Sequence, residues 1–178
     1  MQFWQSNRIS GGITFERDTA MPAFNQGAPC PLVLAGEHHL IVCYYMNRPT
    51  PEFDGTNPKS MSETKANEPC AVVRFEGVED FRFGPPNLDS AVKLTELFPD
   101  FKPWGAHVTN MRNWVSDILQ APKTPIAPLH SAGLRHYVLS FHDSTIEVIA
   151  RGYCVEEGVG SVHAMIAKQH ALRERVSD

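Results

Sequence analysis

The sequence lacks the features that mark three broad classes of protein. It has no run rich in lysine or arginine, and its 16 basic residues are outnumbered by 20 acidic ones. Nucleic-acid binding is therefore disfavoured, because such proteins need clustered cations to neutralise phosphates. No apolar run approaches the roughly eighteen residues that cross a bilayer, and no glycine-rich nucleotide signature or GxSxG elbow is present. We expect a protein that binds neither nucleic acid nor membrane and has no cofactor.

The cysteines are few and far apart. Cys30, Cys43, Cys70 and Cys154 are spaced too widely for a CxxC metal pair or a compact disulfide framework. Cys43 and Cys70 lie in apolar runs, which favours small buried side chains kept reduced over a disulfide or a zinc site. The first twelve residues also lack the basic, apolar and small-residue regions of a signal peptide. These features predict a cytoplasmic location.

The length of 178 residues suits a single domain, 1–178, that buries about two thirds of its unfolded surface. Two segments read as irregular. Residues 47–69 contain four prolines and are expected to form a long loop, which is either functional or disordered. Residues 120–133 carry prolines at 122, 125 and 128 and are expected to form an extended connector.

The clearest structural pattern is a β-hairpin within residues 135–154. A tight turn at Asp143-Ser144 places Phe141, Leu139 and Tyr137 opposite Ile146, Val148 and Ala150 on one apolar face. The other face carries His136, Ser140, Glu147 and Arg151. Val138 opposite Ile149 makes that second face partly apolar, so we expect a helix or long loop to cover it.

Elsewhere, two-residue alternation predicts further strands and helical spacing predicts helices. Strands are expected at 13–16, on both sides of Gly36-Glu37 within 32–46, on both sides of Gly77 within 70–83, and at 106–109. Helices are expected at 88–98, at 111–119 with Asn110 as the cap, and at 160–176. The order predicts an α+β fold: a mainly antiparallel β-sheet with two to three helices packed on it.

Histidines and carboxylates are the candidates for chemistry. His142-Asp143 superficially resembles the HD pair of metal-dependent phosphohydrolases, and His142, Glu147 and His136 have the residue types needed for acid, base or metal-ligand roles. The alternative is that Asp143 and Ser144 only shape the turn. His38 and His39 are candidate metal ligands, although neighbouring residues of a strand point to opposite faces.

Three segments carry a resemblance to a group of small bacterial proteins. They are the HYxxxFHDSTxE pattern from His136 to Glu147, an FxFGxPN segment at 81–87, and a YGAxxVxNSxW-like segment at 104–114. The chain departs from the last pattern with Trp104 in place of tyrosine and Met111-Arg112-Asn113 before Trp114. The resemblance implies a stable hairpin and an α+β fold but no activity, and the proteins that carry these segments include accessory and immunity-like proteins.

Two functional hypotheses follow. The first is a soluble, bacterial, non-enzymatic binding or immunity-like accessory protein that acts through a protein surface on the sheet or on the 47–69 loop. The alternative is a small hydrolase or metal-dependent enzyme that uses His142, Asp143, Glu147 and His136 around a cleft. A homodimer through the sheet face that holds Val138 and Ile149 is the third arrangement to consider.

Overall fold

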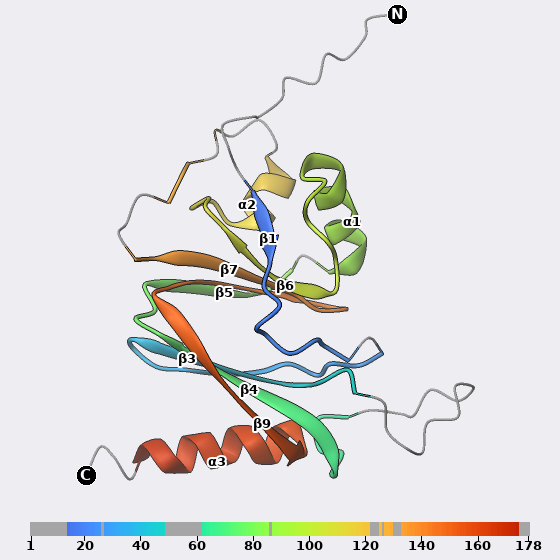
Figure 1. Cartoon of the computed structure of the whole chain (residues 1–178), viewed down its shortest axis with the longest axis vertical. Helices are drawn as coiled ribbons and strands as arrows, with labels where there is room; N and C mark the ends of the chain where they lie inside the picture. Colours follow the sequence, from blue (N-terminus) through green and yellow to red (C-terminus); the bar gives the residue numbers. More distant parts are fainter. Residues whose placement is uncertain are drawn as a thin grey trace, which may run out of the picture.

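Two antiparallel sheets lie face to face, with helices on both outer sides (Figure 1). This computed structural model describes residues 14–25, 27–48, 62–85, 87–121, 125, 127–129 and 133–174. The antiparallel α+β class is confirmed. Most of the predicted 47–69 loop, residues 49–61, and half of the 120–133 connector lie outside the described residues.

The larger sheet has five strands, and the smaller has four. The order in the five-stranded sheet is β1-β6-β7-β8-β5, with bounds Phe15–Arg17, Gly105–Thr109, Arg135–Ser140, Thr145–Ala150 and Asp80–Gly84. The order in the four-stranded sheet is β2-β3-β4-β9, with bounds Leu32–Ala35, His39–Tyr45, Glu68–Glu76 and Gly152–Gly160. The predicted strand pairs around Gly36-Glu37 and Gly77 are both present.

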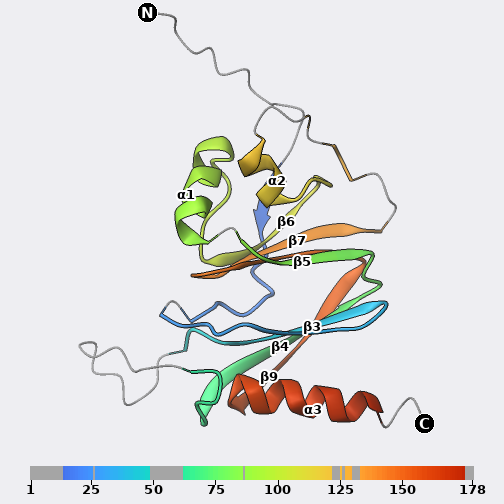
Figure 2. The same ribbon diagram turned by 180° about the vertical axis from the view of Figure 1, so that it is seen from behind.

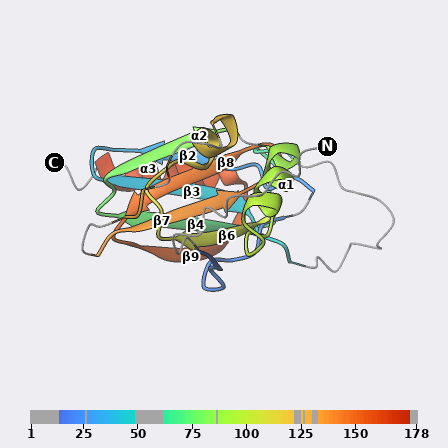
Figure 3. The same ribbon diagram turned by 90° about the horizontal axis from the view of Figure 1, so that it is seen from above.

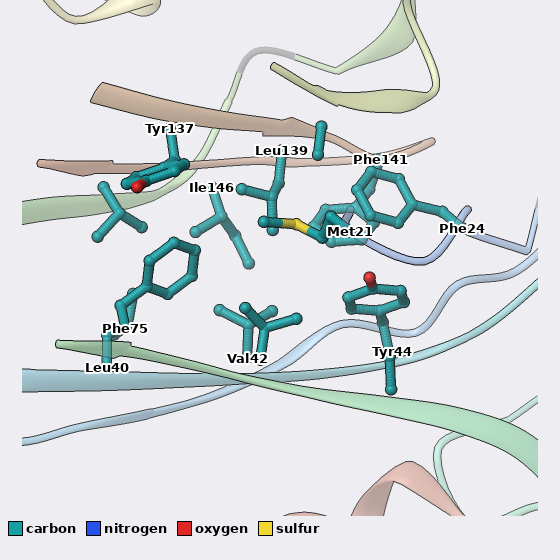
Figure 4. Close-up of a cluster of buried hydrophobic side chains, with 14 of the residues drawn as sticks. Met21, Phe24, Leu40, Val42, Tyr44, Phe75, Tyr137, Leu139, Phe141 and Ile146 are labelled. Atoms are coloured by element: carbon teal, nitrogen blue, oxygen red, sulfur yellow. The ribbon is translucent and has the colours of Figure 1, made fainter. Parts of the chain in front are cut away.

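The space between the sheets is filled by one cluster of buried apolar side chains (Figure 4). Phe141 from the hairpin packs its ring 4.3 Å from that of Phe24 and 5.6 Å from that of Tyr44. Phe75 and Tyr137 pair in the same way at 5.3 Å. Tilted aromatic contacts of this kind add to the stabilisation that burial alone provides.

Helices cover the outer faces of both sheets, as Figures 2 and 3 show from two further directions. The helices α1 (Leu88–Leu97) and α2 (Val115–Gln120) lie on the five-stranded sheet, where Val138 packs with Leu94 and Val115. The helix α3 (Val162–Glu174) covers the four-stranded sheet. None of the helices in the described part of the chain is long and apolar enough to cross a membrane.

The hairpin keeps its predicted faces but not its predicted register. Leu139 pairs with Ile146 and Val138 with Glu147, a shift of two positions, because residues 141–144 form a four-residue loop. A shift of two leaves every side chain on the same face. The apolar face therefore meets the core between the sheets, and the face with Val138 and Ile149 is buried beneath the helical layer. That face is thus closed to a second copy of the chain.

The helix predicted at 111–119 begins instead at Val115, and Asn110 is not its cap. Residues 110–112 are held extended by the connector: the Arg112 amide donates to the Ala127 carbonyl, and the Leu129 amide donates to the Asn110 carbonyl, both at 2.7 Å. These hydrogen bonds outweigh local helix propensity, which is a weak determinant on its own. Trp114 occupies the N-cap position and makes no side-chain capping bond.

Two of the points where the chain passes from one sheet to the other lie next to each other. β4 leads to β5 through Gly77, and β8 leads to β9 through Arg151, whose amide donates to the Glu76 carbonyl at 3.0 Å. β9 was not predicted as a separate strand. It pairs with β4 along its whole length, so the two crossings join the sheets into one continuous ribbon.

Gly77 is expected to tolerate no side chain. Its φ of +59° is a left-handed conformation, and a Cβ there would lie 2.8 Å from Cδ of Arg151. The substitution G77A should therefore lower the free energy of unfolding by about 2 kcal/mol, as measured by urea denaturation. G152A is the matched control, because a Cβ at Gly152 meets nothing within 4 Å. Equal losses in the two variants would contradict the prediction.

Candidate functional site

The hairpin loop places a histidine and a carboxylate side by side at the surface. Nδ1 of His142 lies 2.6 Å from Oδ1 of Asp143. The side chain of His142 is 43 % exposed and that of Asp143 is 91 % exposed. The His142 ring also packs against Trp104, with ring centroids 4.9 Å apart. The imidazole is thus oriented by a carboxylate on one side and an indole on the other.

His136 and Glu147 form a second, separate group on the helix-covered face of the same hairpin. Their side chains are 0 % and 2 % exposed, and Nε2 of His136 lies 3.0 Å from Oε2 of Glu147. Nε2 nevertheless makes no hydrogen bond. On the other side of the ring, Nδ1 lies 3.1 Å from the Met111 carbonyl, which can only accept, so Nδ1 carries a proton.

The buried pair fastens α2 to the sheet. Oε2 of Glu147 accepts the Val115 amide at 2.8 Å, which supplies the cap that Trp114 does not. Trp114 closes the site from outside, with its ring edge-on to His136 at 5.4 Å. Arg82 lies over Trp114 at 4.9 Å and donates to Asp117 at 2.7 Å. Sealed in this way, His136 and Glu147 serve the packing of α2 and are not accessible to a substrate.

The four candidates for catalysis therefore divide into two pairs and do not converge on one cleft. Alternation along the strands places His136 and Glu147 on one face, as the sequence predicts. His142 and Asp143 belong to the loop beyond the last pair, Ser140 and Thr145, so strand alternation does not govern where they point. The predicted hairpin extended its first arm two residues too far, to His142, whereas the strand ends at Ser140.

Of the candidate metal ligands, His39 is the first residue of β3 and His38 lies just before it. The His38 side chain is 80 % exposed, and its Nε2 lies 3.8 Å from Oε1 of Glu37. The pKa of His39 is lowered by burial first, and then by the charges of Arg173 and His38. This basic neighbourhood opposes a bound cation. Within the described residues, no three His, Cys, Asp or Glu side chains are grouped closely enough to hold a metal ion.

An open groove lies next to the hairpin loop, at the end of β5. It is lined by Phe83, Gly84, Pro85, Asn87, Asp143 and Ser144. Phe83 is 49 % exposed, which is unusual for so large an apolar side chain. The groove thus combines an aromatic ring with an amide and an exposed carboxylate.

No family profile, curated protein or solved structure matches the chain.

The sequence analysis assigned no site role to Phe83 or Asn87, although both belong to the FxFGxPN segment at 81–87. The available signal was the end of the alternating run, where Phe81 and Phe83 share a face just before Gly84 and Pro85. Phe81 packs against the core between the sheets, whereas Phe83 lies two positions further along β5 and stays half exposed. Only the pairing of β5 with β8 brings Phe83 next to the hairpin loop.

All four cysteines are free thiols. Cys43 and Cys70 are buried, as predicted, and burial raises the pKa of Cys43 to about 12 and that of Cys70 to about 11. Both are therefore thiols at neutral pH, and a thiol is a poor nucleophile. These two residues contribute to the packing beneath α3 and not to a reactive site.

Proposed function

We propose that this chain is a non-enzymatic binding protein that holds a protein partner at the groove between the end of β5 and the β7–β8 loop. The observation that carries the proposal is the half-exposed ring of Phe83 beside the exposed carboxylate of Asp143. Aromatic side chains are enriched at the centres of protein interfaces. A single exposed apolar residue is common on protein surfaces. One that lines a groove together with polar neighbours is a candidate for contact with a protein partner.

The setting of the groove supports the same proposal. Phe83 lies on a strand, and Asp143 and Ser144 lie in a short loop between two buried strands, so the contact groups are held on a rigid scaffold. Preorganised groups lose little conformational entropy on binding. We further propose an accessory or immunity-like role in the bacterial cytoplasm, which the free thiols and the resemblance in the hairpin segment support.

The alternative, a small hydrolase, has one favourable observation. The 2.6 Å contact of His142 with Asp143 is the orientation that a general base requires. His136 and Glu147 take no part in this alternative, because both are buried beneath α2. Hydrolysis of an ester or phosphate substrate that is lost in H142A and retained in F83A would favour the enzyme over the binding protein.

The binding proposal predicts that peptides selected on this chain contact Phe83. The selection uses a phage-displayed library of random 12-residue peptides, and the affinities of synthetic copies are measured by calorimetry. We expect F83A to weaken binding by about thirtyfold, the size of a typical interface hot spot. V159A is the control, because Val159 is also an exposed apolar residue but lies on β9. Selected peptides that bind wild type and F83A equally would contradict the proposal.

A further inference from the structure

The outer side of β5 is a free edge of the five-stranded sheet. β5 pairs with β8 along Asp80–Gly84, and none of the described strands pairs with its other side. The strand follows the rim of the sheet in Figures 1 and 2 and leads directly into the groove. An edge of this kind presents unpaired amide and carbonyl groups that can accept an additional strand.

The direction of the amides along β5 follows from one hydrogen bond. The Phe81 amide donates to Oδ1 of Asp80 at 2.8 Å, so it points away from β8. Because amides alternate between the two sides of an antiparallel strand, the amide and carbonyl of Phe83 also point outward. At one end of the edge, the outward amide of Phe81 is thus bonded to the Asp80 carboxylate. At the other end, the outward amide next to the groove is that of Phe83.

The side chains along this edge differ between its two faces. Arg82 points to the helical layer, where it contacts Trp114 and donates to Asp117. Phe81 and Phe83 point to the opposite face, towards the core between the sheets. An added strand would therefore meet two phenyl rings on one face and charged groups on the other.

The ends of the edge are both acidic. Asp80 is exposed where β5 begins, and Asp143 is exposed next to Gly84 where β5 ends. Between them, the charge of Arg82 is balanced by Asp117. The two ends are four residues apart, about 13 Å along a strand. Basic side chains four residues apart in an added strand would share a face and reach both ends.

We infer that the partner contributes an extended segment that adds to β5 as a sixth strand, with the pattern basic, apolar, neutral, apolar, basic. The two apolar residues face Phe81 and Phe83, and the neutral residue faces Arg82. This inference rests on the proposed function and specifies its ligand. The net charge of −4 favours the same class of partner through long-range attraction.

A second copy of the chain fits this edge less well. Antiparallel pairing of two β5 strands about Arg82 places the two Arg82 side chains directly opposite each other, and like charges in that position are destabilising. It also pairs Phe83 with Phe81, whose amide is already bonded to Asp80. A basic segment from a different protein with a neutral residue opposite Arg82 avoids the repulsion between arginines, and the Phe81 amide stays bonded to Asp80 whichever strand is added.

The test uses a nine-residue peptide centred on Lys-Val-Thr-Val-Lys and its matched Glu-Val-Thr-Val-Glu counterpart. The lysine peptide is made in two further forms, each N-methylated at alternate amides, so that only one form blocks the amides facing β5. We expect that form to lose at least about tenfold in affinity while the other changes little, because strand addition uses every second amide. The glutamate peptide should not bind.

Two variants test the same point on the protein. F83A removes the ring but keeps the amide, whereas F83P removes both, and proline is tolerated where an edge amide faces solvent. F83P should bind the lysine peptide about tenfold more weakly than F83A, provided that circular dichroism shows both to be folded.

Equal effects of the two N-methylated forms, or no binding of the lysine peptide, would overturn strand addition. The proposed function would still be supported if the binding of library-selected peptides were weakened by F83A. It would be contradicted if F83A left their binding unchanged. Light scattering tests whether a second copy of the chain occupies the edge instead. A dimer that F83P dissociates would assign the edge to that second copy and would contradict the proposal of a basic partner.

Discussion

The substitution E147A is expected to lower the free energy of unfolding by about 4 kcal/mol, which is a large fraction of the stability of a domain of this size. Glu147 is buried, lies 3.0 Å from His136 and accepts the Val115 amide. Its removal leaves both of these groups without their partner in a site that water cannot reach. Urea denaturation followed by tryptophan fluorescence measures the loss, and Trp114 is a local reporter.

Two further variants separate charge from hydrogen bonding at this site. E147Q keeps an acceptor for Val115 and removes the charge, so it should lose about half as much stability. The double variant H136L/E147M replaces the pair with apolar side chains and should recover most of the loss, because well-packed apolar residues often match a buried ion pair. A loss below about 1 kcal/mol in E147A would show that the pair does not hold α2 in place.

The hairpin shows which part of a fold can be predicted from sequence. The two-residue period places Tyr137, Leu139 and Phe141 on one face and His136, Val138 and Ser140 on the other, because that period is intrinsic to a strand. Register depends on the length of the connecting loop, and the polar pair Asp143-Ser144 suits a two-residue turn as well as part of a four-residue loop. The faces were therefore predicted correctly, and the pairing was displaced by two positions.

Tertiary contacts explain the elements that were missed. Met111, Arg112 and Asn113 fit a helical pattern, but pairing with residues 127–129 holds this stretch extended. β9 contains three glycines and two glutamates and has little of the β-branched, alternating character of a strand. It is a strand because β4 offers it a complete edge to pair with. Neither contact is encoded locally.

The candidate site was predictable only in part, for the same reason. His136 and Glu147 were correctly placed on one face, yet nothing in the hairpin sequence indicates that α2 and Trp114 close over them. The groove joins residues 83–85 and Asn87 to residues 143–144, which are about sixty positions away in the chain. Their proximity depends on the pairing of β5 with β8, which alternation alone does not specify.

Acidification is expected to destabilise the protein through His107. Its ring is fully buried, packs 4.8 Å from that of Phe101, and accepts the Lys102 amide at Nε2. Burial first, and the charge of Arg17 second, lower the pKa of His107 to about 4. The unfolded chain, with a histidine pKa near 6.5, therefore binds the proton more readily than the folded chain does.

The sign of the effect follows from this difference. Stability is complete above about pH 6.5 and is lost as the pH falls from about 6.5 towards 4, by about 3 kcal/mol for this residue alone. Urea denaturation at intervals from pH 7.5 to 4.5 measures the slope. In H107Q, the side-chain oxygen can still accept the Lys102 amide but has no proton to gain, so the slope over this range should become much smaller. A slope that is unchanged in H107Q would assign the acid sensitivity to other groups and would mean that the folded protein accommodates a charged His107 at little cost.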